Sequence, residues 1–223
     1  MQFSEWEPVY REIMTDLGIK RSSDEASARS LKMLTLNSDL ADEDMLIRII
    51  GEEVIVAGGN VSEKDIDVLR GMHKGTALIS AGSATDILMS NGIVPDIMVT
   101  DLDGNVELQK KASSSGSLTM MHAHGDNDDL IRAHAKDFTG PVMITTQSTP
   151  DAVLFNFGGF TDGDRAVCAA RHFGAKKIIL FGFDFDVPAH KDGADIEMKK
   201  RKLRWAKKVI YDMNPGDVTL ISR

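Results

Sequence analysis

The chain of 223 residues is 42% apolar and 27% charged, which is enough for a substantial core without disulfides or metal staples. Its 26 basic and 34 acidic residues leave a net charge of -8, which argues against broad nucleic-acid binding. It has no apolar run of about 20 residues and no signal-like start, so we expect a cytoplasmic protein without a membrane segment.

Residues 1–50 are expected to form a helical N-terminal subdomain. Apolar residues recur at helical spacing from Trp6 to Leu17, and a second helix capped by Ser23 or Asp24 is expected to run to residue 34. A third short helix is predicted over residues 43–50. We place the boundary near Gly51, so that residues 51–223 form a second, α/β domain.

In this second domain, short β-branched runs alternate with helical segments. Strands are predicted over residues 54–57, 77–80, 97–100, 118–121, 142–145 and 177–181. Helices are predicted over residues 62–70, 84–91, 106–111, 128–137, 164–173 and 196–211. This alternation is typical of a three-layer α/β fold with a mostly parallel sheet. The single cysteine, Cys168, falls in an apolar helical stretch and is expected to be a buried structural thiol.

The last predicted helix, residues 196–211, carries seven Lys and Arg residues outside its apolar face. A solvated surface is the simpler interpretation of these cations, and contact with substrate phosphates is the alternative. Just before this helix, Pro188, His190 and Asp192 belong either to a flexible lid or to an ordered turn.

Ligands of doubly wound sheets gather outside the carboxyl ends of the strands, so the residues that follow each strand are the informative ones. Asp101 and Asp103 follow the third strand and precede Gly104. If this stretch stays extended, the two carboxylates leave the same face with Cα atoms about 7 Å apart, a spacing suited to Mg²⁺ that carries phosphates. A turn with two solvated aspartates is the alternative.

Two further turns offer groups that bind anions. Ser80, Gly82 and Ser83 supply hydroxyls and backbone N–H groups at a helix start, although ordinary helix capping explains them as well. The loop over residues 155–165 contains Gly158, Gly159 and Arg165, and it suits either closure over a flat ring or a capped helix at Asp162 or Asp164.

Residues 122–127 (HAHGDN) follow the fourth strand. His122 and His124 suggest a zinc site, but the remaining candidates, Asp126 and Asn127, are oxygen ligands and favour Mg²⁺ or Mn²⁺. The alternative is that Asp126 or Asn127 caps the next helix and that one histidine packs in the core.

Residues 95–104 (PDIMVTDLDG), 122–127, 158–165 (GGFTDGDR) and 181–185 (FGFDF) together resemble the archaeal 6-hydroxymethyl-7,8-dihydropterin pyrophosphokinases of the MptE type. The likeness covers most of residues 53–190. It implies a sheet similar to the catalytic domain of thiamine pyrophosphokinases, which makes residues 51–223 the catalytic domain.

The resemblance implies Mg²⁺-dependent transfer of diphosphate from ATP to the hydroxymethyl group of the reduced pterin, with AMP as the second product. Asp101, Asp103 and then Asp126 are the expected metal ligands, and His122 or His124 would assist the hydroxyl or bind phosphate. The expected partners are these small substrates, with no nucleic acid and no membrane. The oligomeric state stays open, a homo-oligomer included.

Three alternatives remain open at this point. Thiamine pyrophosphokinases carry glycine where this chain has Thr100 and serine where it has Gly104, a difference that favours the pterin enzymes without excluding thiamine. Nucleotide-sugar glycosyltransferases of the motility accessory type share the glycine-rich turn after the second strand. A non-catalytic nucleotide-binding protein is the third alternative.

Overall fold

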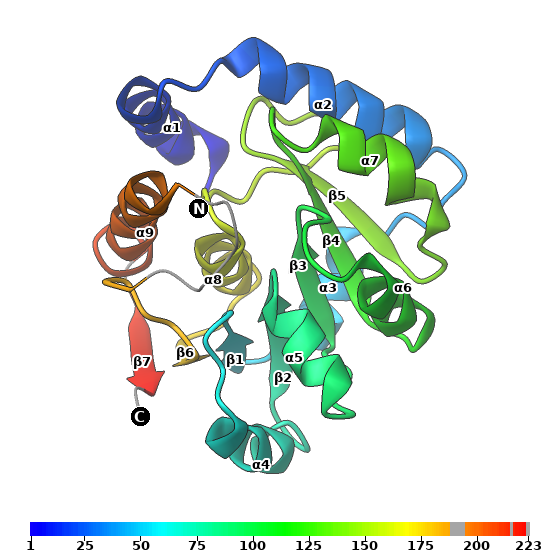
Figure 1. Ribbon diagram of the computed structural model, residues 1–223, viewed down its shortest axis with the longest axis vertical. Coiled ribbons are helices and arrows are strands. Elements are labelled where there is room, and N and C mark those ends of the chain that lie inside the picture. Colours follow the sequence, from blue (N-terminus) through cyan, green and yellow to red (C-terminus); the bar gives the residue numbers. More distant parts are fainter. Residues whose placement is uncertain (188–194, 215, 222–223) are drawn as a thin grey trace.

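The computed structural model describes residues 1–187, 195–214 and 216–221 (Figure 1). The predicted lid or turn around Pro188, His190 and Asp192 lies outside these residues. The helices are α1 (Phe3–Leu17), α2 (Arg21–Leu34), α3 (Glu43–Ile49), α4 (Glu63–Met72), α5 (Ala84–Ser90), α6 (Val106–Ser114), α7 (Asp128–His134), the 3₁₀ turn η1 (Ala135–Asp137), α8 (Asp162–His172) and α9 (Ile196–Tyr211). The strands are β1 (Glu53–Ala57), β2 (Ala77–Ala81), β3 (Ile97–Thr100), β4 (Leu118–Ala123), β5 (Val142–Thr146), β6 (Lys177–Phe181) and β7 (Asp217–Ile221).

The strands form one parallel sheet in the order β5-β4-β3-β2-β1-β6-β7. The central strands are buried along almost their whole length, as β-branched strands covered on both faces should be. The predicted three-layer, parallel α/β fold is therefore confirmed.

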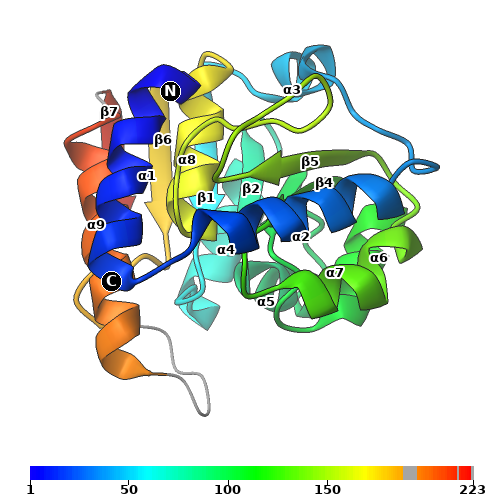
Figure 2. The ribbon, with the colours of Figure 1, turned by 90° about the horizontal axis from the view of Figure 1, so that it is seen from above.

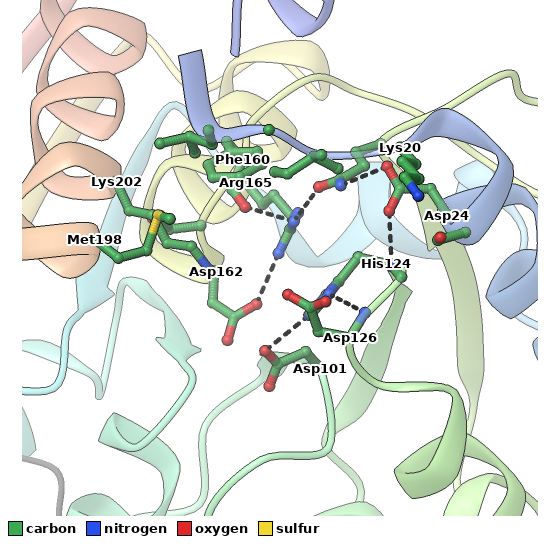
Figure 3. A pocket seen from close by; sticks show the side chains of 17 residues that line it. Lys20, Asp24, Asp101, His124, Asp126, Phe160, Asp162, Arg165, Met198 and Lys202 are labelled. Atoms are coloured by element: carbon green, nitrogen blue, oxygen red, sulfur yellow. Dashed lines mark hydrogen bonds and ion pairs between the residues drawn. The ribbon is translucent and has the colours of Figure 1, made fainter. Parts of the chain in front are cut away.

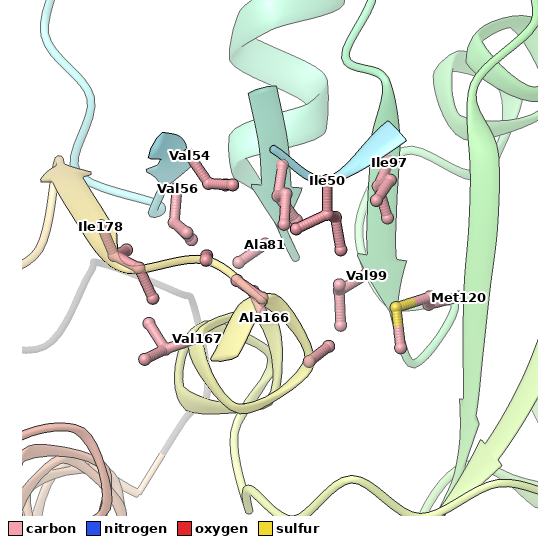
Figure 4. Close-up of a cluster of buried hydrophobic side chains, with 14 of the residues drawn as sticks. Ile50, Val54, Val56, Ala81, Ile97, Val99, Met120, Ala166, Val167 and Ile178 are labelled. Carbon is pink, nitrogen blue, oxygen red and sulfur yellow. The ribbon is translucent and has the colours of Figure 1, made fainter. Parts of the chain in front are cut away.

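Helices cover both faces of the sheet, as the view in Figure 2 shows. On one face, α3 and α8 pack on alternate strand residues, with Val56, Val99 and Ala166 at the centre of this cluster (Figure 4). On the other face, α4 and α5 cover β1 and β2, and α6 and α7 cover β3 and β4. The structure confirms that Cys168 is buried and unpaired, and burial raises the pKa of its thiol.

The first three helices pack at three different places on this α/β body. Helix α1 shares a hydrophobic cluster with α9 and Phe160, α2 packs on α7 and β5, and α3 belongs to the cluster beneath α8. The division of the chain near Gly51 stays a prediction. What the packing establishes is that α1 and α2 reach the carboxyl edge of the sheet.

Three local features differ from the sequence-based expectation. Strand β7 was not predicted, because it lies at the edge of the sheet, buries none of its residues fully and lacks a continuous apolar run. Helix α2 begins at Arg21, so Asp24 lies inside its first turn and does not cap it. Helix α8 is capped by Thr161 in a capping box with Asp164. No described helix has the length and apolarity that a membrane crossing requires.

Candidate functional site

A pocket of about 490 Å³ opens over the carboxyl ends of β3, β4 and β5 (Figure 3). Its floor contains Asp101, His124 and Gln147, from the turns that follow these strands. Its walls come from the α1–α2 connection, the start of α8 and the first turns of α9. Segments from both ends of the chain therefore close over the strand ends.

Asp101 is held from two sides. His124 Nε2 donates to Asp101 Oδ2 over 3.2 Å, and the backbone N–H of Asp103 donates to the other carboxylate oxygen over 3.1 Å. Burial by itself raises the pKa of Asp101, but the hydrogen bond and charge of His124, the Asp103 amide and the charge of Arg165 together lower it to about 2. Asp101 is therefore an ionised acceptor at the pocket floor.

The turn after Asp101 corrects the expectation of an extended pair. Leu102 is buried and has a φ of 68°, in the left-handed region that non-glycine residues rarely adopt, so the chain turns there. Asp103 consequently does not line the pocket. It lies near Asp86, whose pKa is raised by burial and also by the negative charge of Asp103. Asp103 therefore lies on the other side of this turn from the pocket. The metal role predicted for it stays a prediction.

A second pocket carboxylate that interacts with Asp101 by its charge is Asp162, in the first turn of α8. Burial and the charge of Asp101 raise the pKa of Asp162 well above its usual range, although Arg165 Nη1 donates to its Oδ1 over 3.1 Å. A side chain at Gly82 would lie 3.0 Å from Asp162 Oδ2, which explains the glycine in the β2 turn. The sequence reasoning named Asp162 only as a helix cap, because its pairing with Asp101 depends on the position of α8.

Asn127 holds the ends of β3 and β4 together. Its side-chain amide donates to the carbonyl oxygens of Asp101 and His122 over 2.9 and 2.8 Å, and its oxygen accepts from the backbone of His124. His122 is only 1% exposed and bonds to Thr145, outside the pocket. Burial, followed by the charges of Arg165 and His124, lowers the pKa of His122 well below its usual value. His124 and Asp126 line the pocket, and His122 lies beneath it.

The other predicted residues have local structural contacts. Arg165 lines the pocket but is 6% exposed, and its guanidinium already bonds to Asp162, Gln147 and Phe160. A side chain at Gly159 would collide with the Arg165 backbone at 2.5 Å. The remaining predicted residues, Ser80, Gly82, Ser83 and Gly158, do not line this pocket.

A network from α2 was missed by the sequence reasoning. Asp24 is fully buried and accepts hydrogen bonds from Tyr10, from the backbone of Gly125 over 2.7 Å and from Gln147 over 2.8 Å. It thereby ties α1 and α2 to the turn that carries His124. The sequence shows only an aspartate on a polar helix, and two of its three partners, Gly125 and Gln147, are more than 100 residues away.

Two cations also line the pocket: Lys20, which the sequence reasoning did not consider, and Lys202, one of the seven cations for which contact with substrate phosphates was the alternative to a solvated surface. Lys20 precedes α2, and Lys202 projects from α9 beside the Phe160 ring, with 5.7 Å between its Nζ and the ring centroid. Neither ammonium group makes an ion pair or hydrogen bond with any residue that the structure describes.

No group of three or more His, Cys, Asp or Glu side chains is arranged to hold a metal ion within the described ranges. Two adjacent carboxylates that repel one another nevertheless suit Mg²⁺, which is usually bound through one or two carboxylates together with substrate phosphates and water. Asp101 and Asp162 fit that description.

Comparison with known proteins gives concordant matches. Residues 44–189 match the family model described as 6-hydroxymethylpterin diphosphokinase MptE-like. Proteins named 6-hydroxymethyl-7,8-dihydropterin pyrophosphokinase are 36% identical to this chain in Methanocaldococcus jannaschii, over 94% of the chain and 95% of the relative, and in Pyrococcus furiosus, over 94% and 93%. The protein of that name from Methanothermobacter thermautotrophicus is also 36% identical, over 99% of both chains.

Among solved structures, the MAf glycosyltransferase from Magnetospirillum magneticum AMB-1 superimposes with a TM-score of 0.52 at 18% identity. The match covers 77% of this chain and 33% of that one, and it shows a shared fold alone. The family model and the curated relatives, by contrast, match this chain over most of its length. The resemblance read from the sequence motifs is thus confirmed, and the chain belongs to the MptE-like 6-hydroxymethylpterin diphosphokinase family.

Proposed function

We propose that the protein transfers diphosphate from ATP to the hydroxymethyl group of 6-hydroxymethyl-7,8-dihydropterin in a Mg²⁺-dependent reaction that releases AMP. The observation that carries this proposal is the pairing of Asp101 with Asp162 in a pocket that is also lined by Lys20 and Lys202, neither of which pairs with a carboxylate among the described residues. The names of the curated relatives support the same reaction.

The charges in the pocket suit a triphosphate. Asp101 and Asp162 would hold Mg²⁺, which when bound neutralises phosphate charge and orients the phosphate chain. Lys20 and Lys202 supply the remaining positive charge from two different walls of the pocket. Because neither lysine is engaged with a described carboxylate, both are available to phosphate oxygens.

In the proposed reaction, the hydroxymethyl oxygen of the pterin attacks the β-phosphorus of ATP. The bond from that phosphorus to the oxygen shared with the α-phosphate breaks, and AMP leaves with this oxygen. The hydroxyl proton passes to Asp126, an exposed pocket carboxylate that makes no hydrogen bond with any described residue. Positioning and electrostatics contribute most of the rate enhancement in such transfers.

The two histidines have different roles in this proposal. His124 orients Asp101, because its Nε2 donates to that carboxylate while its Nδ1 accepts the backbone N–H of Asp126. His122 is neutral and buried, and it supports the β4 end from below. Neither imidazole then serves as the base for the hydroxyl.

The proposal is tested by measuring AMP release from ATP and Mg²⁺ in three parallel reactions, with the reduced hydroxymethylpterin, with thiamine and without an acceptor. We expect AMP and the pterin diphosphate only in the first reaction. AMP formed with thiamine would move the assignment to thiamine pyrophosphokinases. The absence of AMP with either acceptor would refute diphosphate transfer by this protein.

A further inference from the structure

A second cavity, of about 150 Å³, lies on the same edge of the sheet beside the pocket described above. It sits outside the carboxyl ends of β1 and β6, two adjacent strands that Figure 1 shows near α8 and α9. The two cavities share Thr161, the N-cap of α8. The catalytic machinery proposed above uses only the first cavity.

The topology singles out this location. From β1, the chain adds β2 to β5 on one side of the sheet and then returns to add β6 and β7 on the other side. The strand order therefore reverses between β1 and β6. In open α/β sheets, the crevice outside the carboxyl ends of the strands at such a reversal is where nucleotides bind.

The walls of the second cavity suit a flat ring. The half-buried ring of Phe183 lies between two glycine backbones: a side-chain carbon at Gly58 would be 3.0 Å from this ring, and one at Gly163 would be 2.8 Å from it. Phe185 and Leu203 complete the apolar wall. Among the described residues that line the cavity, the one charged side chain is Asp184, which accepts the backbone N–H groups of Asp186 and Val187.

We propose that this second cavity binds the adenine base of the nucleotide. The inference rests on the proposed diphosphate transfer. The distance between each substrate's ring and the reacting β-phosphorus decides which ring occupies which cavity. The pterin ring is one carbon away from the attacking oxygen, so it must lie beside the reacting phosphorus, in the pocket that contains Asp101. Adenine is separated from that phosphorus by the ribose and the α-phosphate, so it belongs in the neighbouring cavity, which lacks Asp101 and His124.

The two cavities meet at the start of α8, where Thr161 lines both and Asp162 and Gly163 each line one. The phosphate chain would cross at this point. Asn60, an exposed residue that lines the second cavity, makes no side-chain hydrogen bond with any described residue. An asparagine amide can accept from the exocyclic amine of adenine and donate to a ring nitrogen.

The test is to fill the cavity from α9 with Leu203→Trp and to use Lys207→Trp, at an exposed position of the same helix, as the matched control. Calorimetric titration with AMP, without acceptor, reports on the base site independently of turnover. We expect Leu203→Trp to weaken AMP binding by about tenfold or more, which is the usual loss when a contact between a base and an aromatic side chain is removed. The KM for ATP should rise by a similar factor. The KM for the pterin and inhibition by inorganic tripolyphosphate should match those of Lys207→Trp.

A milder variant, Asn60→Ala, covers the case in which Leu203→Trp does not fold, and we expect it to weaken AMP binding while tripolyphosphate inhibition is unchanged. Unaltered AMP binding in a folded Leu203→Trp protein, or a raised KM for the pterin alone, would overturn the assignment. If the wild type binds AMP in this cavity but transfers no diphosphate, the proposed reaction fails while the base site stands.

Discussion

Asp101 is kept ionised by its neighbours in spite of its burial. Its carboxylate faces His124 on one side and the repelling Asp162 on the other, so the charge at the pocket floor depends on a few directed contacts. The buried, left-handed Leu102 that follows aims Asp101 into the pocket and turns Asp103 away from it. Such backbone strain is typical of functional sites.

Asp101→Asn is expected to lower kcat by about 10²- to 10³-fold, the usual loss when one preorganised electrostatic group is removed from an active site. Asp103→Asn, two residues away, is expected to cost much less, because Asp103 does not line the pocket. Steady-state rates of both variants, with circular dichroism to confirm folding, provide the measurement. Equal losses in the two variants would instead support the metal role predicted for Asp103.

The buried His122 predicts a pH dependence of stability. Burial and the facing charges of Arg165 and His124 depress the folded-state pKa of His122, while Gln147 and Thr145 are its neutral neighbours. Below about pH 6.5, the pKa of an unfolded histidine, the unfolded chain binds a proton that the folded protein does not. The free energy of unfolding should therefore fall as the pH drops below about 6.5.

His122→Asn removes this titration and should flatten the pH dependence of the free energy of unfolding in that range. Urea unfolding of the wild type and the variant between about pH 7 and pH 5 gives the comparison. Identical slopes in the two proteins would show that His122 is not the group responsible.

At the scale of elements, α2 contributes more than an apolar face. The carboxylate of Asp24 joins α1, the β4–α7 turn and the end of β5 through Tyr10, Gly125 and Gln147. Burial, strengthened by the hydrogen bond to Asp24, raises the pKa of Tyr10. The network sets the position of the turn that carries His124.

Asp24→Ala should lower the free energy of unfolding by about 1–3 kcal/mol, because the buried donors that it satisfies lose their acceptor. It should also lower activity, because the turn at Gly125 loses its anchor. Arg29→Ala, at an exposed position of the same helix, is the control and should lie within about 0.5 kcal/mol of the wild type in urea unfolding. A wild-type stability for Asp24→Ala would exclude the anchoring role.

At the scale of the whole molecule, the fold is expected to be independent of the metal that the reaction needs. Four hydrophobic clusters hold the sheet and helices together without it. Chelation should abolish turnover and leave the far-ultraviolet circular dichroism unchanged. Adding Mg²⁺ should raise Tm, because the ion binds the folded state and relieves the repulsion between Asp101 and Asp162.

In Asp162→Asn this rise of Tm with Mg²⁺ should disappear. Differential scanning fluorimetry with increasing Mg²⁺ measures the effect in both proteins. An equal rise in the variant would place the metal elsewhere.

Much of the fold was predictable, because six of the strands read as short apolar runs between helices. The seventh, β7, was not, because an edge strand buries little and none of its residues is fully buried. The rule that polar groups follow the carboxyl ends of strands also predicted the proximity of Asp101 and His124. The extended spacing expected for Asp101 and Asp103 was wrong, because the chain turns at Leu102, as in the alternative that the sequence left open. The metal role of Asp103 stays a prediction.

The sequence by itself determined the parallel α/β fold, the family and the edge of the sheet where polar groups gather, because these follow from local periodicity and from short motifs. Only the tertiary structure decided that Asp162 accompanies Asp101, that Asp24 braces the β4 turn and that Lys20 and Lys202 enter the pocket. The physical reason is that each of these contacts joins segments far apart in the chain, and their spacing depends on how α1, α2, α8 and α9 pack on the sheet.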